Sequence, residues 1–201
     1  MRANGSRMKS LFLALLGFIP HSMAEPSVAI QPLGPVKEAE IARVKAGILS
    51  LYAVNVEVLP EKPLPKEAYF APRDRYKADK LLDVLAADTP AKFTKVIGLT
   101  VRDVSTKKGK IVDWGIFGLG ALGERPCVVS TFRLRAGKAT DEVFLARLVK
   151  VVNHELGHTF GLDHCPEAGC FMQDAGGKIA TVDGESGKPC AACAARLPVV
   201  K

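Results

Sequence analysis

Long hydrophobic runs are absent from this sequence of 201 residues. No apolar stretch reaches the roughly 18 residues that a membrane-spanning helix needs, so we expect no stable membrane insertion once the N-terminal signal described below is cleaved. A strong excess of one charge is also missing, because 28 Lys and Arg stand against 21 Asp and Glu, and we expect no nucleic-acid binding. Repeats and low-complexity segments are absent too. The composition, 48% hydrophobic and 24% charged, is typical of a globular protein with one sizeable core.

Residues 1–24 have the composition of a secretory signal peptide. Three basic residues come before a short apolar run from Leu11 to Ile19, and small residues precede Glu25 as they do at a cleavage site. Cleavage would make the protein secreted or periplasmic. It would leave a mature domain of residues 25–201 in which 25 of the 28 basic residues remain. The alternative is a helix that is not cleaved and that packs on the domain or anchors it.

Hydrophobic spacing predicts alternating strands and helices in the first two thirds of the chain. Short alternating or β-branched runs predict strands at Val28–Ile30, Asn55–Leu59, Lys95–Val101 and Cys127–Phe132. Apolar residues at helical spacing predict helices over Pro35–Tyr52 and Tyr76–Ala87. The proline-rich stretch Pro60–Arg75 is expected to be a surface loop. This order predicts an α/β fold, a sandwich in which a mixed, mostly parallel sheet is packed with helices.

A longer helix is expected from Thr140 to Gly161, and it carries two histidines four residues apart. Thr140 is a candidate N-cap, and Gly161 can turn the chain sharply at the other end because it lacks a Cβ. His154 and His158 would project from the same face of this helix, one turn apart. The turn would bring His164 back toward them, so the three imidazoles are candidate ligands of one zinc ion.

Glu155 follows the first histidine, where its carboxylate can reach a zinc-bound water without binding the metal. Three protein ligands leave one position for water, which is the arrangement of a catalytic zinc site. Zinc lowers the pKa of such a water to about 7, and Glu155 would accept its proton and pass it to a departing amine. The five fixed residues of the pattern would co-occur by chance in on the order of one in a hundred thousand such chains. Histidines that merely fill a core are therefore a poor explanation.

Four of the five cysteines form two close pairs near the histidines: Cys165, Cys170, Cys190 and Cys193. Two close pairs separated by a loop are typical of a tetrahedral structural zinc site, which would organise a segment with little apolar material of its own. Two disulfides are the alternative in an exported protein, and a zinc-ribbon binding module is a third interpretation. Cys127 is expected to be a buried free thiol in a strand.

The run from His154 to His164 resembles the H-E-x-x-H-x-x-G-x-x-H motif of the metzincin clan of metalloproteases, which also have a downstream methionine, here Met172. The spacing of the methionine and cysteines over residues 165–193 narrows this resemblance to the archaemetzincin family. The resemblance implies a zinc metallopeptidase with two Zn²⁺ ions. One would be catalytic, with Met172 in a turn beneath it, and the four cysteines would bind the other.

The implied partner is a peptide or protein substrate, and we expect the protein to be a monomer. A zinc-stabilised binding protein that kept the fold without the activity is the alternative. Glu155 argues against that alternative, because a degenerate protein could readily lose it. A self-processing or toxin-like protease with one dedicated substrate is a further possibility that the sequence leaves open.

These interpretations predict distances between side chains. One nitrogen from each motif histidine should lie within about 4 Å of a common point, since zinc–nitrogen bonds are about 2.0–2.1 Å long. If the cysteines bind zinc, their sulfurs should lie roughly 3.7–3.9 Å apart. A disulfide would bring two of them to about 2.05 Å.

Overall fold

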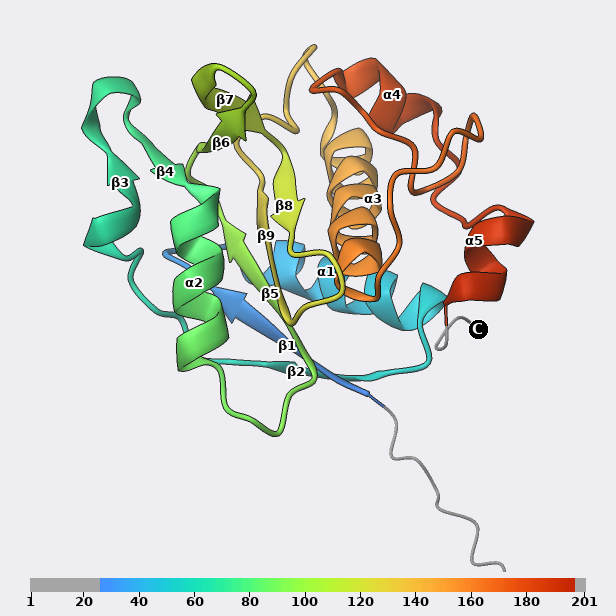
Figure 1. Ribbon diagram of the computed structural model, residues 1–201, viewed down its shortest axis with the longest axis horizontal. Coiled ribbons are helices and arrows are strands. Elements are labelled where there is room, and N and C mark those ends of the chain that lie inside the picture. Colours follow the sequence, from blue (N-terminus) through green and yellow to red (C-terminus); the bar gives the residue numbers. More distant parts are fainter. Residues whose placement is uncertain (1–25, 198–201) are drawn as a thin grey trace, which may run out of the picture.

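The computed structural model describes residues 26–197, which form two β-sheets flanked by helices (Figure 1). The expected signal peptide at residues 1–24 lies outside the described residues. Among the helices of residues 26–197, none is long and apolar enough to cross a membrane.

The main sheet has five strands in the order β2-β1-β5-β9-β8. Its strands are β1 (Ser27–Pro32), β2 (Asn55–Val58), β5 (Lys95–Thr100), β8 (Gly118–Gly120) and β9 (Pro126–Ser130). The first four strands in the sheet order run parallel, and β8 pairs antiparallel with β9 at the edge. The mixed, mostly parallel sheet predicted from the sequence is confirmed.

Alternate residues of the main sheet face two different layers of helices. Helices α1 (Glu38–Leu51) and α3 (Asp141–Thr159) cover one face, and α2 (Ala78–Asp88) covers the other. In β1, Val28 and Ile30 pack in the cluster under α1 and α3, whereas Ala29 packs in the cluster under α2. This is the period of two that a strand imposes on its side chains. The three strands and two helices expected before residue 102 lie where the hydrophobic spacing placed them.

A second, smaller sheet lies beside the first and has the strand order β3-β4-β6-β7. Its strands are β3 (Tyr69–Phe70), β4 (Arg75–Lys77), β6 (Val104–Lys108) and β7 (Ile111–Ile116). Two short 3₁₀ helices, η1 (Lys66–Ala68) and η2 (Ala71–Arg73), flank β3. The expectation of a plain surface loop over Pro60–Arg75 is therefore wrong for its second half. The local sequence does not predict β4, because this strand forms by pairing with β6, which lies some 28 residues further along the chain.

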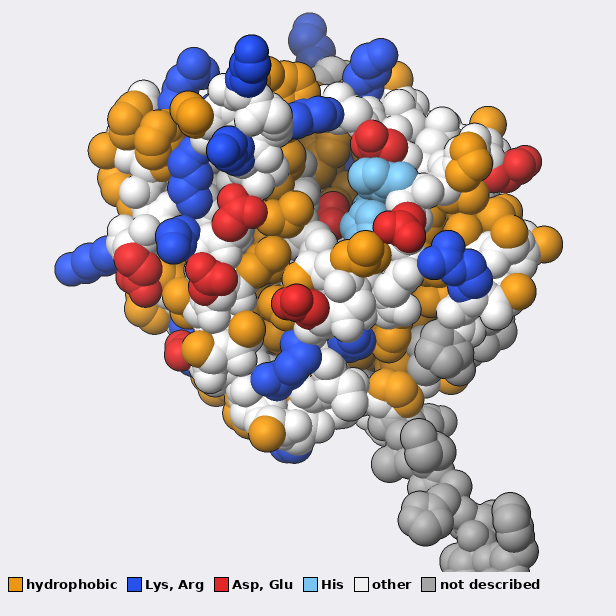
Figure 2. Space-filling view, in the orientation of Figure 1, with side chains coloured by type: hydrophobic (Ala, Val, Ile, Leu, Met, Phe, Trp, Pro, Cys, Tyr) orange, Lys and Arg blue, Asp and Glu red, His pale blue; other side chains and the backbone are white. Residues whose placement is uncertain are grey.

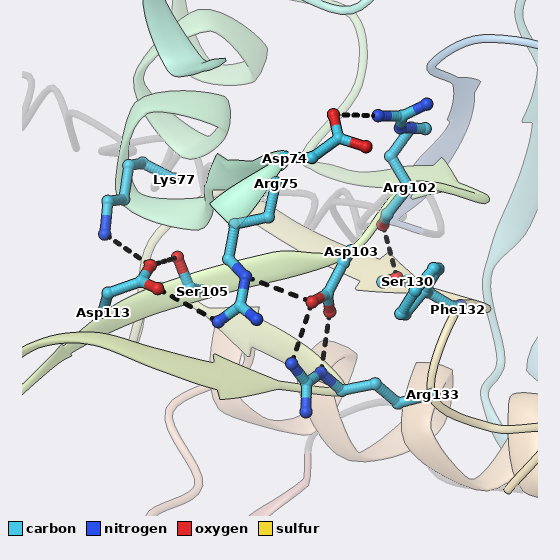
Figure 3. A network of polar contacts seen from close by, with 10 residues as sticks. All are labelled: Asp74, Arg75, Lys77, Arg102, Asp103, Ser105, Asp113, Ser130, Phe132 and Arg133. Atoms are coloured by element: carbon cyan, nitrogen blue, oxygen red, sulfur yellow. Dashed lines mark hydrogen bonds and ion pairs between the residues drawn. The ribbon is translucent and has the colours of Figure 1, made fainter. Parts of the chain in front are cut away.

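Buried ion pairs hold the second sheet together (Figure 3). Asp103, only 6% exposed, accepts hydrogen bonds from Nε and Nη2 of Arg133 at 2.7 and 2.8 Å. The Nε atom of Arg75 lies 3.2 Å from the same carboxylate. The Arg133 guanidinium lies against Gly115 of β7, where an added Cβ would overlap it. Arg133 is therefore part of this network.

Asp113 of β7 is the second carboxylate of the network. It accepts hydrogen bonds from Lys77 at 2.8 Å, from Ser105 at 2.6 Å and from Arg75 at 3.1 Å. Burial alone would raise the pKa of Asp113, but these hydrogen bonds and the charge of Arg75 outweigh burial and lower it. A pKa that is lower in the folded state means that the group stabilises the fold above its unfolded pKa. That stability is lost as the pH falls through the folded pKa.

The C-terminal segment is fastened to α3. It contains α4 (Ile179–Gly184) and α5 (Ala191–Arg196). Arg147 of α3 binds Asp183 through two hydrogen bonds of 2.7 and 2.8 Å, and the Lys150 ammonium donates to three carbonyl groups around the end of α4. The segment also adds buried apolar side chains to the core under α1 and α3, namely Phe171, Met172, Val182 and Leu197. It therefore shares the core of the domain and does not form its own.

Replacing Asp103 by Asn should destabilise the protein by about 3 kcal/mol, because two guanidinium groups lose their shared buried carboxylate. Urea unfolding followed by far-UV circular dichroism measures this change. Asp83→Asn is the matched control, because the Lys80–Asp83 pair is exposed, with 60% and 73% of the two side chains accessible. It should change stability by no more than about 0.5 kcal/mol. Equal effects of the two substitutions would contradict a structural role for the buried network.

Candidate active site

Helix α3 positions the site, and its two ends are well defined. The Thr140 hydroxyl accepts the backbone N–H of Val143 at 3.3 Å, as an N-cap does. The helix ends at Thr159, whose carbonyl accepts a hydrogen bond of 2.5 Å from the Lys95 ammonium. Gly161 follows with φ +91°, a left-handed conformation that favours glycine. The chain therefore leaves the helix and doubles back as the motif predicts.

The structure brings the three motif histidines together. His154, His158 and His164 each offer one ring nitrogen, and these atoms lie within 4.8 Å of one another. The Nε2 atoms of His154 and His158 are 3.1 Å apart. Two nitrogens at tetrahedral positions around zinc should be roughly 3.3 Å apart, given bonds of about 2.0–2.1 Å. The donor set and its spacing therefore fit a zinc ion with three protein ligands.

Backbone carbonyls orient two of these rings. The Nδ1–H of His154 donates to the carbonyl of Phe171 at 2.8 Å, and the Nδ1–H of His158 donates to the carbonyl of Leu162 at 2.7 Å. Each ring therefore turns its Nε2 lone pair toward the common centre, as ligands supported by neighbouring groups do. Burial lowers the pKa of His154 to about 3 and lowers that of His158 as well, so both rings are neutral at pH 7 and able to bind a metal.

Glu155 lies at the same site, with 7% of its surface exposed. Burial raises the pKa of its carboxyl group to about 8, and a hydrogen bond from the backbone N–H of Gly120 acts in the opposite direction. A carboxyl group tuned toward neutral pH in a cleft is typical of a proton-transfer group.

The histidines and Glu155 open onto a cleft. Figure 2 shows the histidines at one side of a hollow whose floor contains hydrophobic side chains. The cleft is lined by β8, by Trp114 of β7 and by the segment Gln173–Gly177. Lys107 and Lys108, at the end of β6, also line the cleft. One wall of the cleft is β8, the edge strand of the main sheet.

The four C-terminal cysteines form a second cluster. One sulfur each from Cys165, Cys170, Cys190 and Cys193 lies within 4.8 Å of the others. The sulfurs of Cys165 and Cys190 are 3.8 Å apart, the separation expected for two thiolates on one tetrahedral zinc. All five cysteines of the described residues are free thiols, and Cys127 is fully buried in β9 as expected. The backbone N–H of Cys193 lowers the pKa of Cys190 to about 7, which favours the thiolate that a metal binds.

Met172 packs directly behind the histidine-bearing turn. It is fully buried, and a Cβ added to Gly157 would lie 2.5 Å from its sulfur. Gly157, which lies between Glu155 and His158, therefore makes room for the methionine. Sequence reasoning placed Met172 near the site but missed this role of Gly157. A glycine inside a helix, where it costs stability, was the available signal.

Comparisons with known proteins agree on one family. The model of Peptidase family M54 matches residues 39–198. The archaemetzincin of Halobacterium salinarum is 32% identical over 173 residues, which cover 83% of this chain and 96% of that protein. The archaemetzincin of Methanopyrus kandleri is 36% identical over 146 residues, which cover 72% of this chain and 79% of that protein.

Solved structures agree as well. The crystal structure of the Methanopyrus kandleri archaemetzincin matches with a TM-score of 0.75 at 28% identity, over 89% of this chain and 97% of that chain. The structure of archaemetzincin from Archaeoglobus fulgidus, complexed with malonate, matches with a TM-score of 0.72 at 28% identity. It covers 85% of this chain and 99% of that chain.

Gly157→Ala should weaken zinc binding at the histidine site roughly ten- to hundred-fold, because the added methyl group displaces Met172 and presses on the ring of Phe171, the residue whose carbonyl orients His154. Zinc affinity is measured by competition with a chelator. Gly47→Ala is the matched control, because its Cβ would also meet a side chain at 2.5 Å, that of Val149, away from the site. Both variants should lose about 1–3 kcal/mol of stability by overpacking. Unchanged zinc affinity in Gly157→Ala would show that the methionine does not support the site.

Proposed function

We propose a specific catalytic apparatus for this chain, which belongs to peptidase family M54, the archaemetzincins. Membership of this family makes it a zinc metallopeptidase that acts on peptides or proteins. His154, His158 and His164 hold the catalytic zinc, and Glu155 is the general base. The observation that carries this proposal is the convergence of three imidazole nitrogens within 4.8 Å beside a buried carboxyl group in a cleft.

The three imidazoles would hold the zinc ion, which would supply an acidified water, polarise the peptide carbonyl and favour ionisation of a carboxyl group close by. Glu155 accepts a proton from the attacking water at its carboxylate. The same carboxyl group then delivers this proton to the departing amine as the peptide bond breaks. The carbonyls of Phe171 and Leu162 keep the two helix imidazoles oriented throughout.

We also propose that the protein holds a second zinc, bound by Cys165, Cys170, Cys190 and Cys193. The sulfur spacing of 3.8 Å between Cys165 and Cys190 supports it. This ion would join the start of the C-terminal segment to α5 and thereby support the wall of the cleft. Finally, the composition of residues 1–24 supports export of the protein, with removal of these residues, to the periplasm or beyond the cell.

Glu155→Gln should abolish peptide hydrolysis and leave zinc content nearly unchanged, because the amide keeps the shape of the side chain but cannot accept a proton. The measurement is cleavage of a peptide library by the purified protein, with and without a chelator. Glu142→Gln, an exposed position in the first turn of the same helix, is the control and should keep full activity. Full activity of Glu155→Gln would remove Glu155 from the mechanism.

Metal analysis combined with thiol titration tests the second ion. Protein purified from the exported fraction should contain two zinc ions per chain, and all five cysteines should titrate as thiols after denaturation in chelator. The histidine-bound ion should be removed first, because its site opens onto the cleft. The mass of the same sample shows whether residues 1–24 were removed. One zinc with only Cys127 titrating would indicate disulfides and refute the second zinc site, while the peptidase assignment would stand.

A further inference from the structure

Two glycines of the edge strand β8 lie in close contact with the active-site helix. A Cβ added to Gly118 would lie 2.7 Å from Cγ and 2.8 Å from Oε1 of Glu155. A Cβ added to Gly120 would lie 2.5 Å from the carbonyl oxygen of Glu155 and 2.8 Å from Cβ of His158. Real Cβ atoms do not approach other atoms this closely, so β8 packs at this distance from α3 only because both positions lack a side chain.

The backbone of β8 also presents its free hydrogen-bonding edge to this helix. The N–H of Ala121 donates to Pro126 at 3.0 Å, and the carbonyl of Phe117 accepts from Ser130 at 2.8 Å. Since antiparallel ladder bonds alternate along a strand, the peptide groups of Gly118 and Gly120 point away from β9. The N–H of Gly120 meets the Glu155 carboxylate there as a hydrogen-bond donor. One oxygen of the carboxylate is thus restrained by the Gly120 N–H, and the Gly118 Cα leaves it room.

We propose that Gly118 and Gly120 are positioning residues for peptide hydrolysis: the side-chain-free strand β8 holds the Glu155 carboxylate in its working place. This inference rests on the proposed function of Glu155 as general base. The two glycines act on different parts of the site. Gly118 leaves room for the side chain of Glu155. Gly120 donates its N–H to the Glu155 carboxylate and also lies against the helix backbone and His158.

This difference gives the two alanine variants different expected defects. Gly118→Ala pushes the carboxylate away from β8 without touching a histidine, so it should lower kcat. A misplacement of about 1 Å costs roughly a hundred-fold in rate, and we expect a fall of that order with KM changed less than about three-fold and zinc content unchanged. Gly120→Ala shifts the turn that carries His158, so it should lower both kcat and zinc affinity.

The added methyl group at Gly118 would also lie 2.8 Å from the carbonyl of Val128, so strain in the sheet needs its own control. Gly98→Ala supplies it. Gly98 lies in β5 of the same sheet, and its Cβ would meet Cδ1 of Leu85 at 2.7 Å. The atoms nearest to this Cβ belong to Leu85 and Leu33 and to no residue of the histidine motif. Gly98→Ala should lower the unfolding midpoint in urea at least as much as Gly118→Ala, while its folded fraction keeps the wild-type kcat.

Two further measurements complement these rates: the first does not need a folded Gly118→Ala protein, and the second does not measure turnover. Incorporation of glycolic acid at position 120 replaces the donor N–H by an ester oxygen without adding bulk. This change should lower kcat roughly ten-fold, which is the effect expected from the loss of a hydrogen bond to a charged group. A crystal structure of zinc-free Gly118→Ala should show the Glu155 carboxylate displaced from β8 by comparison with the zinc-free parent.

The outcomes separate this inference from the function on which it rests. A kcat within about three-fold of the parent in both Gly118→Ala and the ester variant, with Glu155→Gln inactive, would overturn the positioning role and leave the base assignment intact. An equal loss of kcat in Gly98→Ala would attribute the effect to strain and also overturn it. Full activity of Glu155→Gln would instead refute the proposed function itself.

Discussion

The close packing of α3 on the main sheet fixes the direction in which its last two turns face. Phe144, Leu148 and Val152 anchor its apolar side in the core, and Arg147 and Lys150 hold α4 against its flank. The turn that carries the histidines is left facing the cleft. Metal ligands must sit within a few tenths of an ångström of their places, so every contact that restrains this helix also restrains the zinc site. The C-terminal segment and β8 close on the same helix from opposite sides.

Much of this arrangement could be predicted from sequence because its signals are local. The four-residue spacing of His154 and His158 is a property of one helix. The Thr140 hydroxyl accepts its hydrogen bond from the N–H of a residue only three positions further along the chain. The strands of the main sheet carry their own runs of β-branched residues. The motif with Gly161 fixed the return of His164 because a sharp turn at that point has few alternatives.

Other parts depended on partners far away in the sequence. Strands β3 and β4 lie in and next to a stretch whose prolines and charges suggest a loop. They form because β6 is available and Asp103 and Asp113 neutralise Arg75. Gly118 and Gly120 have no recognisable pattern of their own. Their role becomes visible only when β8 is placed against Glu155, which is about 35 residues further along the chain.

Side chains alternate along β7 between a face that stabilises the second sheet and a face that lines the cleft. Asp113 and Gly115 face the ion pairs that stabilise the second sheet, whereas Trp114 and Ile116 line the cleft. Substitutions on the cleft side can reshape the surface that meets a peptide while the stabilising carboxylate and guanidinium groups stay in place. Substitution of Trp114 or Ile116 is therefore a way to alter which peptides the cleft accepts at small cost in stability.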